Sequence, residues 1–230
     1  DPMDGAALGA VAAATRATFL IGTPSFVRAY MRRIEPEQLS SLRFAFVGAE
    51  RCPTELRMAF KERYHAELLE GYGTTELSPV VSVNTEKDPR DGSVGRPLPG
   101  VEVFTISPET RKILPPGETG ELVVRSPARM LGYLDRPDLT DAAFVHGGYA
   151  TGDIGRVDSE GFVHITGRLA RFAKIGGEMV PLDPIEQRLQ QAVTAICPSA
   201  GELAVTSVPD GRKGERIVVL YTDLGCTPDD

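Results

Sequence analysis

The hydrophobic pattern of the first 90 residues predicts strands that alternate with helices. Two apolar runs, Thr18–Ile21 and Leu42–Val47, are each followed by a segment whose hydrophobic residues recur at helical spacing. These segments begin near Pro24 and Pro53, and proline is well tolerated in the first turn of a helix. A third short strand is expected near Glu67–Glu70. Such an alternation predicts parallel strands joined by right-handed crossovers, as in part of a doubly wound α/β sheet.

From about Arg90 onward, short alternating runs replace the helical spacing. The runs Val101–Ile106 and Glu121–Arg125 predict strands, and the tetrapeptide Asp158–Gly161 predicts a hairpin turn. We therefore expect an antiparallel, barrel-like β subdomain after the α/β part.

The last part of the chain has a third pattern. A basic, glycine-containing segment leads to a predicted helix at Pro184–Val193, followed by strands near Leu203–Val208 and Ile217–Tyr221. These elements predict the start of a small α+β domain. The expected division is an α/β subdomain over residues 1–92, a β-rich subdomain over 93–168 and the small domain over 169–230.

Composition narrows the class of protein. Hydrophobic residues make up 41% of the chain and charged residues 25%, as in ordinary globular proteins. The formal net charge of −7 disfavours a nonspecific nucleic-acid role. Cys52, Cys197 and Cys226 include no C-x-x-C pair, which argues against a disulfide framework or a thiolate metal site and favours a reducing cytoplasm. The sequence shows neither a 20-residue apolar run nor a secretion signal.

The segment Gly71–Glu76 (GYGTTE) follows a predicted strand, where ligands bind in open parallel sheets. Its glycines would let backbone approach an anion, Thr74 and Thr75 offer hydroxyl donors, and Glu76 offers a hard oxygen ligand for Mg²⁺. Tyr72 offers a face on which a base could stack. By local composition alone, the segment is more typical of a tight turn whose threonines cap the next element.

Two further segments carry candidate binding groups. In Tyr149–Asp153 (YATGD) a carboxylate follows a turn glycine, where it could accept hydrogen bonds from a ribose diol. An Asx-turn is the structural alternative. Arg168, Arg171 and Lys174 could meet phosphates, although taken singly they are more typical of a solvated face.

The order of these pieces is more informative than any one of them. GYGTTE, GELVVRSPARMLGYL, YATGD and GRLARFAKIGGEMV together resemble the ordered motifs of the adenylate-forming superfamily of acyl-CoA synthetases, luciferases and adenylation domains. The resemblance covers nearly the whole chain. Within that superfamily, these segments look most like the acyl-acyl-carrier-protein synthetase half of bacterial 2-acylglycerophosphoethanolamine acyltransferases.

The resemblance implies a two-step ligase reaction. A fatty acid attacks the α-phosphate of Mg-ATP to give acyl-AMP, and a thiol of coenzyme A or of acyl carrier protein then takes the acyl group. It assigns catalytic roles to Thr75, at the α-phosphate, and to Glu76, as the Mg²⁺ ligand. It assigns nucleotide or acyl-pocket contacts to the following residues: Gly48, Ala49, Glu50, Glu70, Gly71, Tyr72, Gly73 and Thr74.

The later motifs receive roles by the same resemblance. Asp153 and Arg168 would hold the ribose hydroxyls, and Gly176 and Gly177 would lie beside the pantetheine thiol during the second step. A hinge would fall at Ala170, where relatives usually carry Asp or Lys. The small side chain there still permits a dihedral change.

Two expected motifs are absent from this sequence, namely the upstream phosphate loop and the C-terminal lysine motif. We therefore expect an internal piece of a longer ligase, inactive alone and with an exposed sheet edge. We expect the protein to associate with a membrane only through a fused acyltransferase part. The alternatives are a noncatalytic nucleotide-binding or carrier-docking module, and an amino-acid or aryl-acid adenylation domain.

Overall fold

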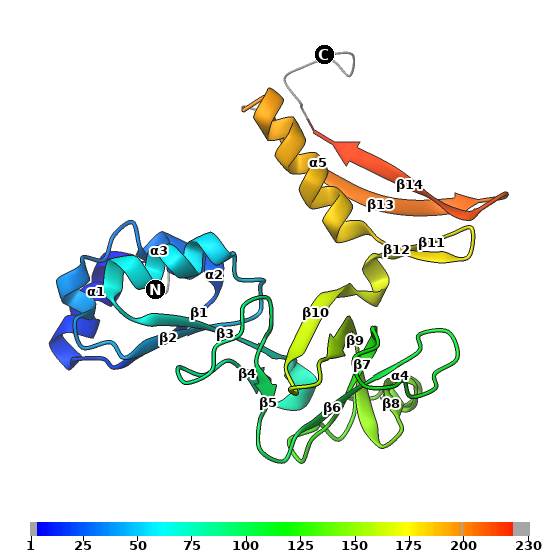
Figure 1. The fold of residues 1–230 in the computed structure, drawn as a ribbon, viewed down its shortest axis with the longest axis horizontal. Coiled ribbons are helices and arrows are strands. Elements are labelled where there is room, and N and C mark those ends of the chain that lie inside the picture. Colours follow the sequence, from blue (N-terminus) through cyan, green and yellow to red (C-terminus); the bar gives the residue numbers. More distant parts are fainter. Residues whose placement is uncertain (1–3, 199, 223–230) are drawn as a thin grey trace. The chain divides into compact units, whose positions relative to one another are not determined.

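A computed structural model describes residues 4–198 and 200–222 (Figure 1). The chain forms two compact units, one of residues 1–151 with 155–165 and one of residues 152–154 with 166–230. The predicted three-part division at residues 92 and 168 stays a prediction.

The first unit opens with parallel strands and helices, as the hydrophobic pattern predicts. The elements are α1 (Gly5–Thr15), β1 (Phe19–Gly22), α2 (Pro24–Tyr30), the 3₁₀ turn η1 (Pro36–Leu39), β2 (Phe44–Val47), α3 (Thr54–Tyr64) and β3 (Glu67–Gly73). β1 pairs with β2, and β2 with β3, both in parallel. The start of α2 is fixed locally, because the Thr23 hydroxyl accepts a hydrogen bond from the Phe26 N–H and Pro24 occupies the first helical position.

One face of this sheet carries the core. Ala45, Val47 and Leu68 point to the side on which buried residues of all three helices gather, among them Val27 and Phe60. The alternate residues point to the opposite face, where Phe19 is 49% and Ile21 66% exposed. β1 lies at the end of the strand order, so among the described residues it forms an exposed, apolar sheet edge, as expected from the sequence.

The sheet then changes direction. After the 3₁₀ turn η2 (Thr75–Leu77), β4 (Val80–Val83) folds back against β3, and β5 (Arg96–Pro97) pairs with β4, both antiparallel. The strand order of this sheet is β1-β2-β3-β4-β5.

A second sheet confirms the predicted antiparallel part. Most of it belongs to the first unit, whereas residues 152–154 of β9 and 166–168 of β10 belong to the second unit. Its elements are β6 (Glu102–Ile106), β7 (Gly120–Arg125), α4 (Pro137–Ala143), β8 (Phe144–Val145), β9 (Gly148–Val157) and β10 (Val163–Arg168). The strand order is β10-β9-β7-β6, with β8 paired to β9. Leu122, Val124 and Val163 are fully buried in its core. Gly161 has φ of 84° and supplies the left-handed position of the predicted hairpin turn.

The Phe162 ring after that turn is buried between two cations. The guanidinium carbons of Arg90 and Arg96 lie 4.3 and 4.1 Å from its centroid. Asp158 accepts hydrogen bonds from the Phe162 and Glu160 N–H groups, at 2.9 and 3.0 Å. The turn is therefore fixed by stacking and by its own aspartate, the Asx-type arrangement that turn aspartates favour.

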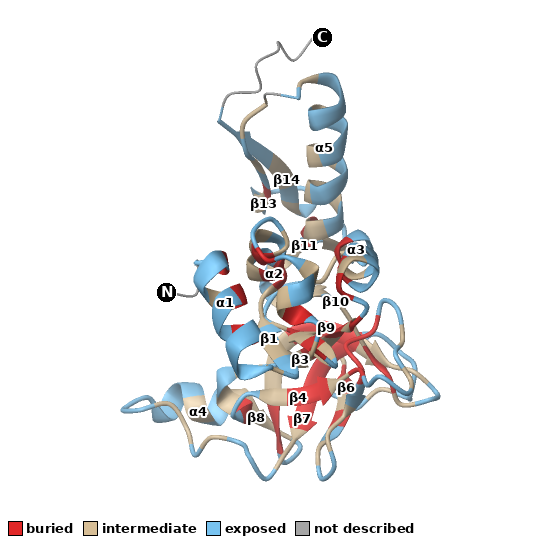
Figure 2. Ribbon diagram, turned by 90° about the vertical axis from the view of Figure 1, so that its left-hand side faces the viewer, coloured by how far each residue is buried: buried red, intermediate tan, exposed pale blue. Residues whose placement is uncertain are grey.

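The second unit is a small four-stranded sheet with one long helix. It contains the 3₁₀ turn η3 (Leu169–Arg171), β11 (Phe172–Ile175), β12 (Glu178–Pro181), α5 (Leu182–Ile196), β13 (Leu203–Asp210) and β14 (Gly214–Tyr221), in the strand order β12-β11-β14-β13. Its buried hydrophobic core is small, with Ala173, Leu182 and Val205 at the centre. Figure 2 shows that α5 is exposed or half-buried along most of its length.

Arg171 connects three elements of this unit. Its guanidinium donates to Asp183 Oδ1 (2.6 Å) and Glu186 Oε2 (2.8 Å) on α5, and to the Val205 carbonyl (2.8 Å) on β13. Glu186 also accepts the Val205 N–H at 2.7 Å. The cation that the sequence offered as a phosphate contact therefore forms an internal cross-link here.

Cys52 and Cys197 are free thiols, and Cys226 lies outside the described residues. Burial, with a contribution from the Glu70 charge, raises the pKa of Cys52 to about 11. None of the helices that the structure describes is long and apolar enough to cross a membrane.

Candidate functional site

The candidate nucleotide segment begins inside a strand. The sequence places Gly71, Tyr72 and Gly73 in a loop, but they belong to β3, because β4 pairs with them. A side chain at Gly71 would overlap the Phe46 ring, and one at Gly73 would overlap the Pro79 carbonyl. Close packing of the chain against itself therefore requires these two glycines.

The turn after β3 presents the polar groups. Leu77 is fully buried, and its N–H donates to the Thr74 carbonyl at 3.0 Å. This anchor leaves Thr75 exposed and Glu76 half-exposed. The Thr74 hydroxyl is buried and has no hydrogen-bond partner among the described residues. An unpaired buried hydroxyl is costly, so the turn holds a polar group suited to a ligand.

Two tyrosines hold the Glu76 carboxylate. Tyr133 Oη donates to Glu76 Oε1 at 2.8 Å, and the hydroxyls of Tyr133 and Tyr149 lie 3.2 Å apart. Burial alone would raise the pKa of Glu76, but its own N–H and the hydroxyls of Tyr133 and Tyr149 outweigh burial and lower that pKa. Glu76 is therefore an ionised acceptor at neutral pH. The sequence motifs predict no role for either tyrosine.

The segment after β2 lies beside the same strand. A Cβ at Gly48 would lie 3.5 Å from the Gly71 carbonyl. Glu70 Oε1 accepts the Cys52 N–H at 3.0 Å, and burial raises the pKa of Glu70. The carboxylate of Glu70 thus links residues 48–52 to β3.

Glu50 and Ala49 show how the segment after β2 is held. Glu50 Oε2 accepts hydrogen bonds from the Ser25 hydroxyl and N–H, at 2.6 and 3.2 Å, at the start of α2. Ala49 has φ of 67°, in the left-handed region that disfavours a residue with a Cβ. The Glu50 side chain is therefore engaged by the fold. The predicted ligand roles of these residues stay predictions.

The later motif residues lie in the second unit. Asp153 is 4% exposed, and its Oδ1 lies 3.1 Å from Nε of Arg168, whose side chain is 74% exposed. The structure thus brings together the two residues expected to hold a ribose. Ala170 is exposed and lies in the 3₁₀ turn η3, directly after this pair.

Gly176 and Gly177 form the turn between β11 and β12, with φ of 61° and 93°. A Cβ at either position would meet nothing within 4 Å. The turn conformation rather than close packing within this chain therefore explains the two glycines. Their expected position beside a thiol stays a prediction.

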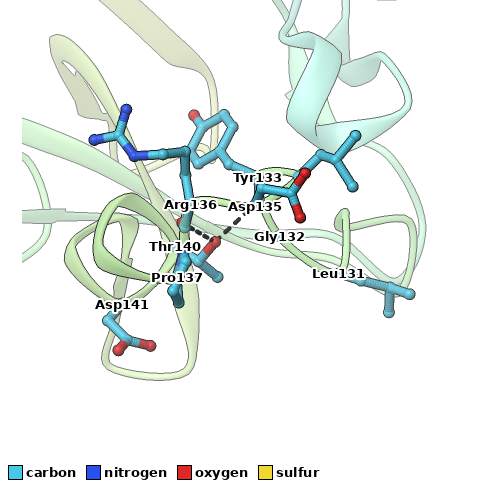
Figure 3. A pocket seen from close by; sticks show the side chains of 9 residues that line it. Leu131, Gly132, Tyr133, Asp135, Arg136, Pro137, Thr140 and Asp141 are labelled. Atoms are coloured by element: carbon cyan, nitrogen blue, oxygen red, sulfur yellow. Dashed lines mark hydrogen bonds between the residues drawn. The ribbon is translucent and has the colours of Figure 1, made fainter.

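A separate open cavity of about 450 Å³ lies between residues 131 and 141 (Figure 3). The sequence-predicted site residues do not line it, but Tyr133 does. Thr140 Oγ1 accepts the Tyr133 N–H at 3.0 Å and donates to the Arg136 carbonyl at 2.9 Å. These bonds fix the backbone that carries the Tyr133 phenol.

Known proteins that are similar to this chain include fatty-acid–CoA ligases. The chain is 34% identical to a long-chain-fatty-acid–CoA ligase of Escherichia coli over 88% of its own length and 36% of the relative. It is 35% identical to a medium-chain fatty-acid–CoA ligase of Escherichia coli over 87% of its length and 35% of the relative. It thus spans about a third of the curated relatives that it matches.

Solved structures give the same result for the fold. The structure of ATP-bound MatB from Rhodopseudomonas palustris matches 99% of this chain and 44% of its own, at 32% identity and a TM-score of 0.76. The sequence profile described as AMP-binding enzyme matches residues 1–134, more than half of the chain. With the ordered motifs and the Thr74–Glu76 turn, this match shows that the chain belongs to the AMP-binding enzyme family.

Proposed function

We propose that this chain is part of an ATP-dependent ligase that activates a fatty acid as acyl-AMP and transfers the acyl group to a thiol. The observation that carries the proposal is the Thr74–Glu76 turn, with a buried unpaired hydroxyl beside an ionised carboxylate. The names of the relatives support a fatty acid as substrate.

The residues of the turn fit a nucleotide phosphate. The orphaned Thr74 hydroxyl gains a partner if a phosphate oxygen binds there, and the exposed Thr75 offers a second donor. Tyr72 is half-buried and offers part of its ring to an adenine. Asp153 and Arg168 supply the acceptor and donor that a ribose diol requires.

The same turn fits Mg²⁺ bound through a nucleotide. No group of three or more potential ligand side chains gathers anywhere in residues 4–198 and 200–222. Mg²⁺ is usually held by one or two carboxylates together with substrate phosphates, and Glu76 offers such a carboxylate. When bound, Mg²⁺ would neutralise charge that develops on the phosphates.

The proposed first step is a substitution at phosphorus. A carboxylate oxygen of the acid bonds to the α-phosphorus of ATP, and the bond from that phosphorus to the pyrophosphate oxygen breaks. Thr74 and Thr75 would donate hydrogen bonds to the phosphates, and Tyr72, Asp153 and Arg168 would orient the adenosine. Most of the acceleration would come from positioning and charge stabilisation.

The proposed second step is attack of a thiolate on the acyl-AMP carbonyl, which releases AMP. The relatives are named as CoA ligases, which favours coenzyme A, and the phosphopantetheine of acyl carrier protein is the alternative acceptor. Ala170 would act as the hinge between the two steps. Gly176 and Gly177 would flank the thiol.

Titration calorimetry of the 230-residue chain with Mg-ATP and with a nonhydrolysable acyl-AMP analogue tests the proposal. Tyr72→Leu removes the stacking ring but keeps apolar volume, and Asp153→Ala removes the ribose acceptor. Tyr72→Leu should weaken binding about tenfold, as loss of base stacking does elsewhere. Asp153→Ala should also weaken binding about tenfold, because a hydrogen bond to a charged group is lost. Tyr221→Leu and Asp138→Ala, at exposed positions, are the matched controls.

Two outcomes would contradict the assigned contacts. Equal binding by all four variants would refute the assigned adenosine contacts. Absence of binding by the folded wild-type chain would refute a nucleotide site formed by these residues alone.

A further inference from the structure

Glu76 is held by residues distant in sequence. Its side chain accepts a hydrogen bond from Tyr133, and its backbone carbonyl accepts the Met130 N–H at 2.8 Å. Because the single Tyr133 hydroxyl proton is directed to the carboxylate, Tyr149 must be the donor in the contact between the two phenols. The result is a relay of hydroxyl groups that ends on Glu76 Oε1.

The Tyr133 backbone and the Tyr149 ring are held by contacts that do not involve Glu76. The Tyr133 backbone is held by Thr140, as Figure 3 shows. Tyr149 is 6% exposed on β9, and its ring packs edge-on against Phe144, with centroids 6.2 Å apart. With the Tyr133 backbone and the Tyr149 ring held in place, the two hydroxyls restrict the orientation of the carboxylate.

Orientation matters for a carboxylate that ligates a small cation. Mg²⁺ requires near-ideal octahedral geometry, and outer partners of ligating carboxylates commonly fix the ligand. A carboxylate with about four acceptor sites retains several after it accepts one phenol. The relay can therefore orient Glu76 and still leave oxygen lone pairs for a cation.

We infer that Tyr133 and Tyr149 are positioning residues that hold the Glu76 carboxylate for a divalent cation bound with ATP. This inference rests on the proposed function of the Thr74–Glu76 turn. Tyr133 acts directly on Glu76, and Tyr149 acts through Tyr133. The effect of removing a hydroxyl should therefore be larger at Tyr133 than at Tyr149.

Metal dependence separates this role from a purely structural one. The test measures ATP affinity of the 230-residue chain by calorimetry, once with Mg²⁺ and once with EDTA, in wild type, Tyr133→Phe and Tyr149→Phe. Tyr64→Phe is the matched control, because the Tyr64 hydroxyl is buried and donates to the Ile34 carbonyl at 2.9 Å. The Tyr64 hydroxyl also accepts the Arg63 Nε–H at 3.3 Å, so this variant, like Tyr133→Phe, removes a phenol hydroxyl that has two partners.

The expected result concerns the gain in ATP affinity that Mg²⁺ produces. Tyr133→Phe should reduce that gain about tenfold, the usual effect of removing an outer partner of a ligand, and leave affinity in EDTA unchanged. Tyr149→Phe should reduce it by a smaller factor, and Tyr64→Phe should keep it. An unchanged gain in Tyr133→Phe, or an equal loss in Tyr64→Phe, overturns the inference.

A second measurement tests the contact without any nucleotide. In a double-mutant cycle, urea unfolding is compared for wild type, Tyr133→Phe, Glu76→Ala and the double variant. In the wild-type background, Tyr133→Phe should lower the equilibrium ratio of folded to unfolded protein about fivefold. In the Glu76→Ala background, the same substitution should lower this ratio clearly less. Additive effects would show that the two side chains are not coupled, and would overturn the positioning role.

The two measurements distinguish the failure of each idea. Coupling in the cycle together with no magnesium-dependent ATP binding by wild type would refute a nucleotide site formed by these residues alone and the cation role with it. Magnesium-dependent binding that Tyr133→Phe leaves intact would retain the proposed function and refute the positioning role.

Discussion

Replacement of Arg171 by alanine should loosen the second unit selectively. The guanidinium joins η3 to α5 and β13 through three hydrogen bonds, two of them to carboxylates. The buried core of this unit is small, so a polar cross-link contributes a large share of its stability. Loss of the guanidinium also leaves the Val205 carbonyl without this partner.

The magnitude follows from the partners and their exposure. Hydrogen bonds to charged groups contribute about 1.5–3 kcal/mol each when sheltered, whereas exposed ion pairs contribute about 0.2–1 kcal/mol. The Arg171, Asp183 and Glu186 side chains are 32%, 36% and 31% exposed, which places the pairs between these limits. We expect a loss of about 2–3 kcal/mol, or about 30- to 150-fold faster exchange of amides that open with the unit.

Hydrogen exchange followed by mass spectrometry measures each unit separately, which a single melting curve does not. Peptides from α5 and β13 should lose protection in Arg171→Ala, while peptides from α3 and β7 should not. Arg188→Ala is the control, because Arg188 is an exposed cation on the same helix. Equal protection in the two variants, or a loss spread over both units, would refute the reasoning.

Three further predictions concern the first unit. Hydrogen bonds from a histidine and two backbone N–H groups outweigh burial and lower the pKa of Asp158 to about 2. The stabilising effect of this carboxylate should therefore disappear as pH falls from about 4 toward 2. The free energy of unfolding of Asp158→Asn should vary less with acid pH than that of wild type, and an identical pH profile would contradict this. Cys52 should react with a thiol reagent at pH 8 more slowly than Cys197, because a pKa raised from 9.0 to about 11 lowers the thiolate fraction of Cys52 about 100-fold. Peptide mapping after timed labelling checks this, and faster labelling of Cys52 would exclude the raised pKa. Phe162→Leu should lower the free energy of unfolding, measured by urea titration, by about 1–3 kcal/mol, because packing and the stacking of two guanidinium groups are lost. A change within about 0.5 kcal/mol would show that the stacking contributes little.

Much of the fold followed from local patterns. The apolar run Thr18–Ile21 became β1, shifted by one residue, and the helix expected at Pro24 begins there. Hydrophobic period and proline position act within a few residues, so sequence alone reveals them. The helix expected at Pro184–Val193 is longer, Leu182–Ile196, because helix ends depend on neighbouring elements as well as on propensity.

The structural setting of the segment Gly71–Glu76 differs from the one that the sequence predicts. Gly71 and Gly73 were expected in a loop and lie in β3, because pairing with β4 is a nonlocal event. Likewise, Arg171 was considered as a phosphate contact, and its carboxylate partners became visible only once α5 lay beside η3. Residue type gave the chemistry of each group, and tertiary pairing decided what each group meets.

The sequence by itself determined the order of the elements, the family resemblance and the identity of Thr74, Thr75 and Glu76 as candidate ligand groups. The tertiary structure alone decided that Glu76 accepts a hydrogen bond from Tyr133, which lies 57 residues later in the chain. Helical and strand periods report neighbours within a few positions, whereas a side-chain contact between distant segments depends on how the whole unit packs.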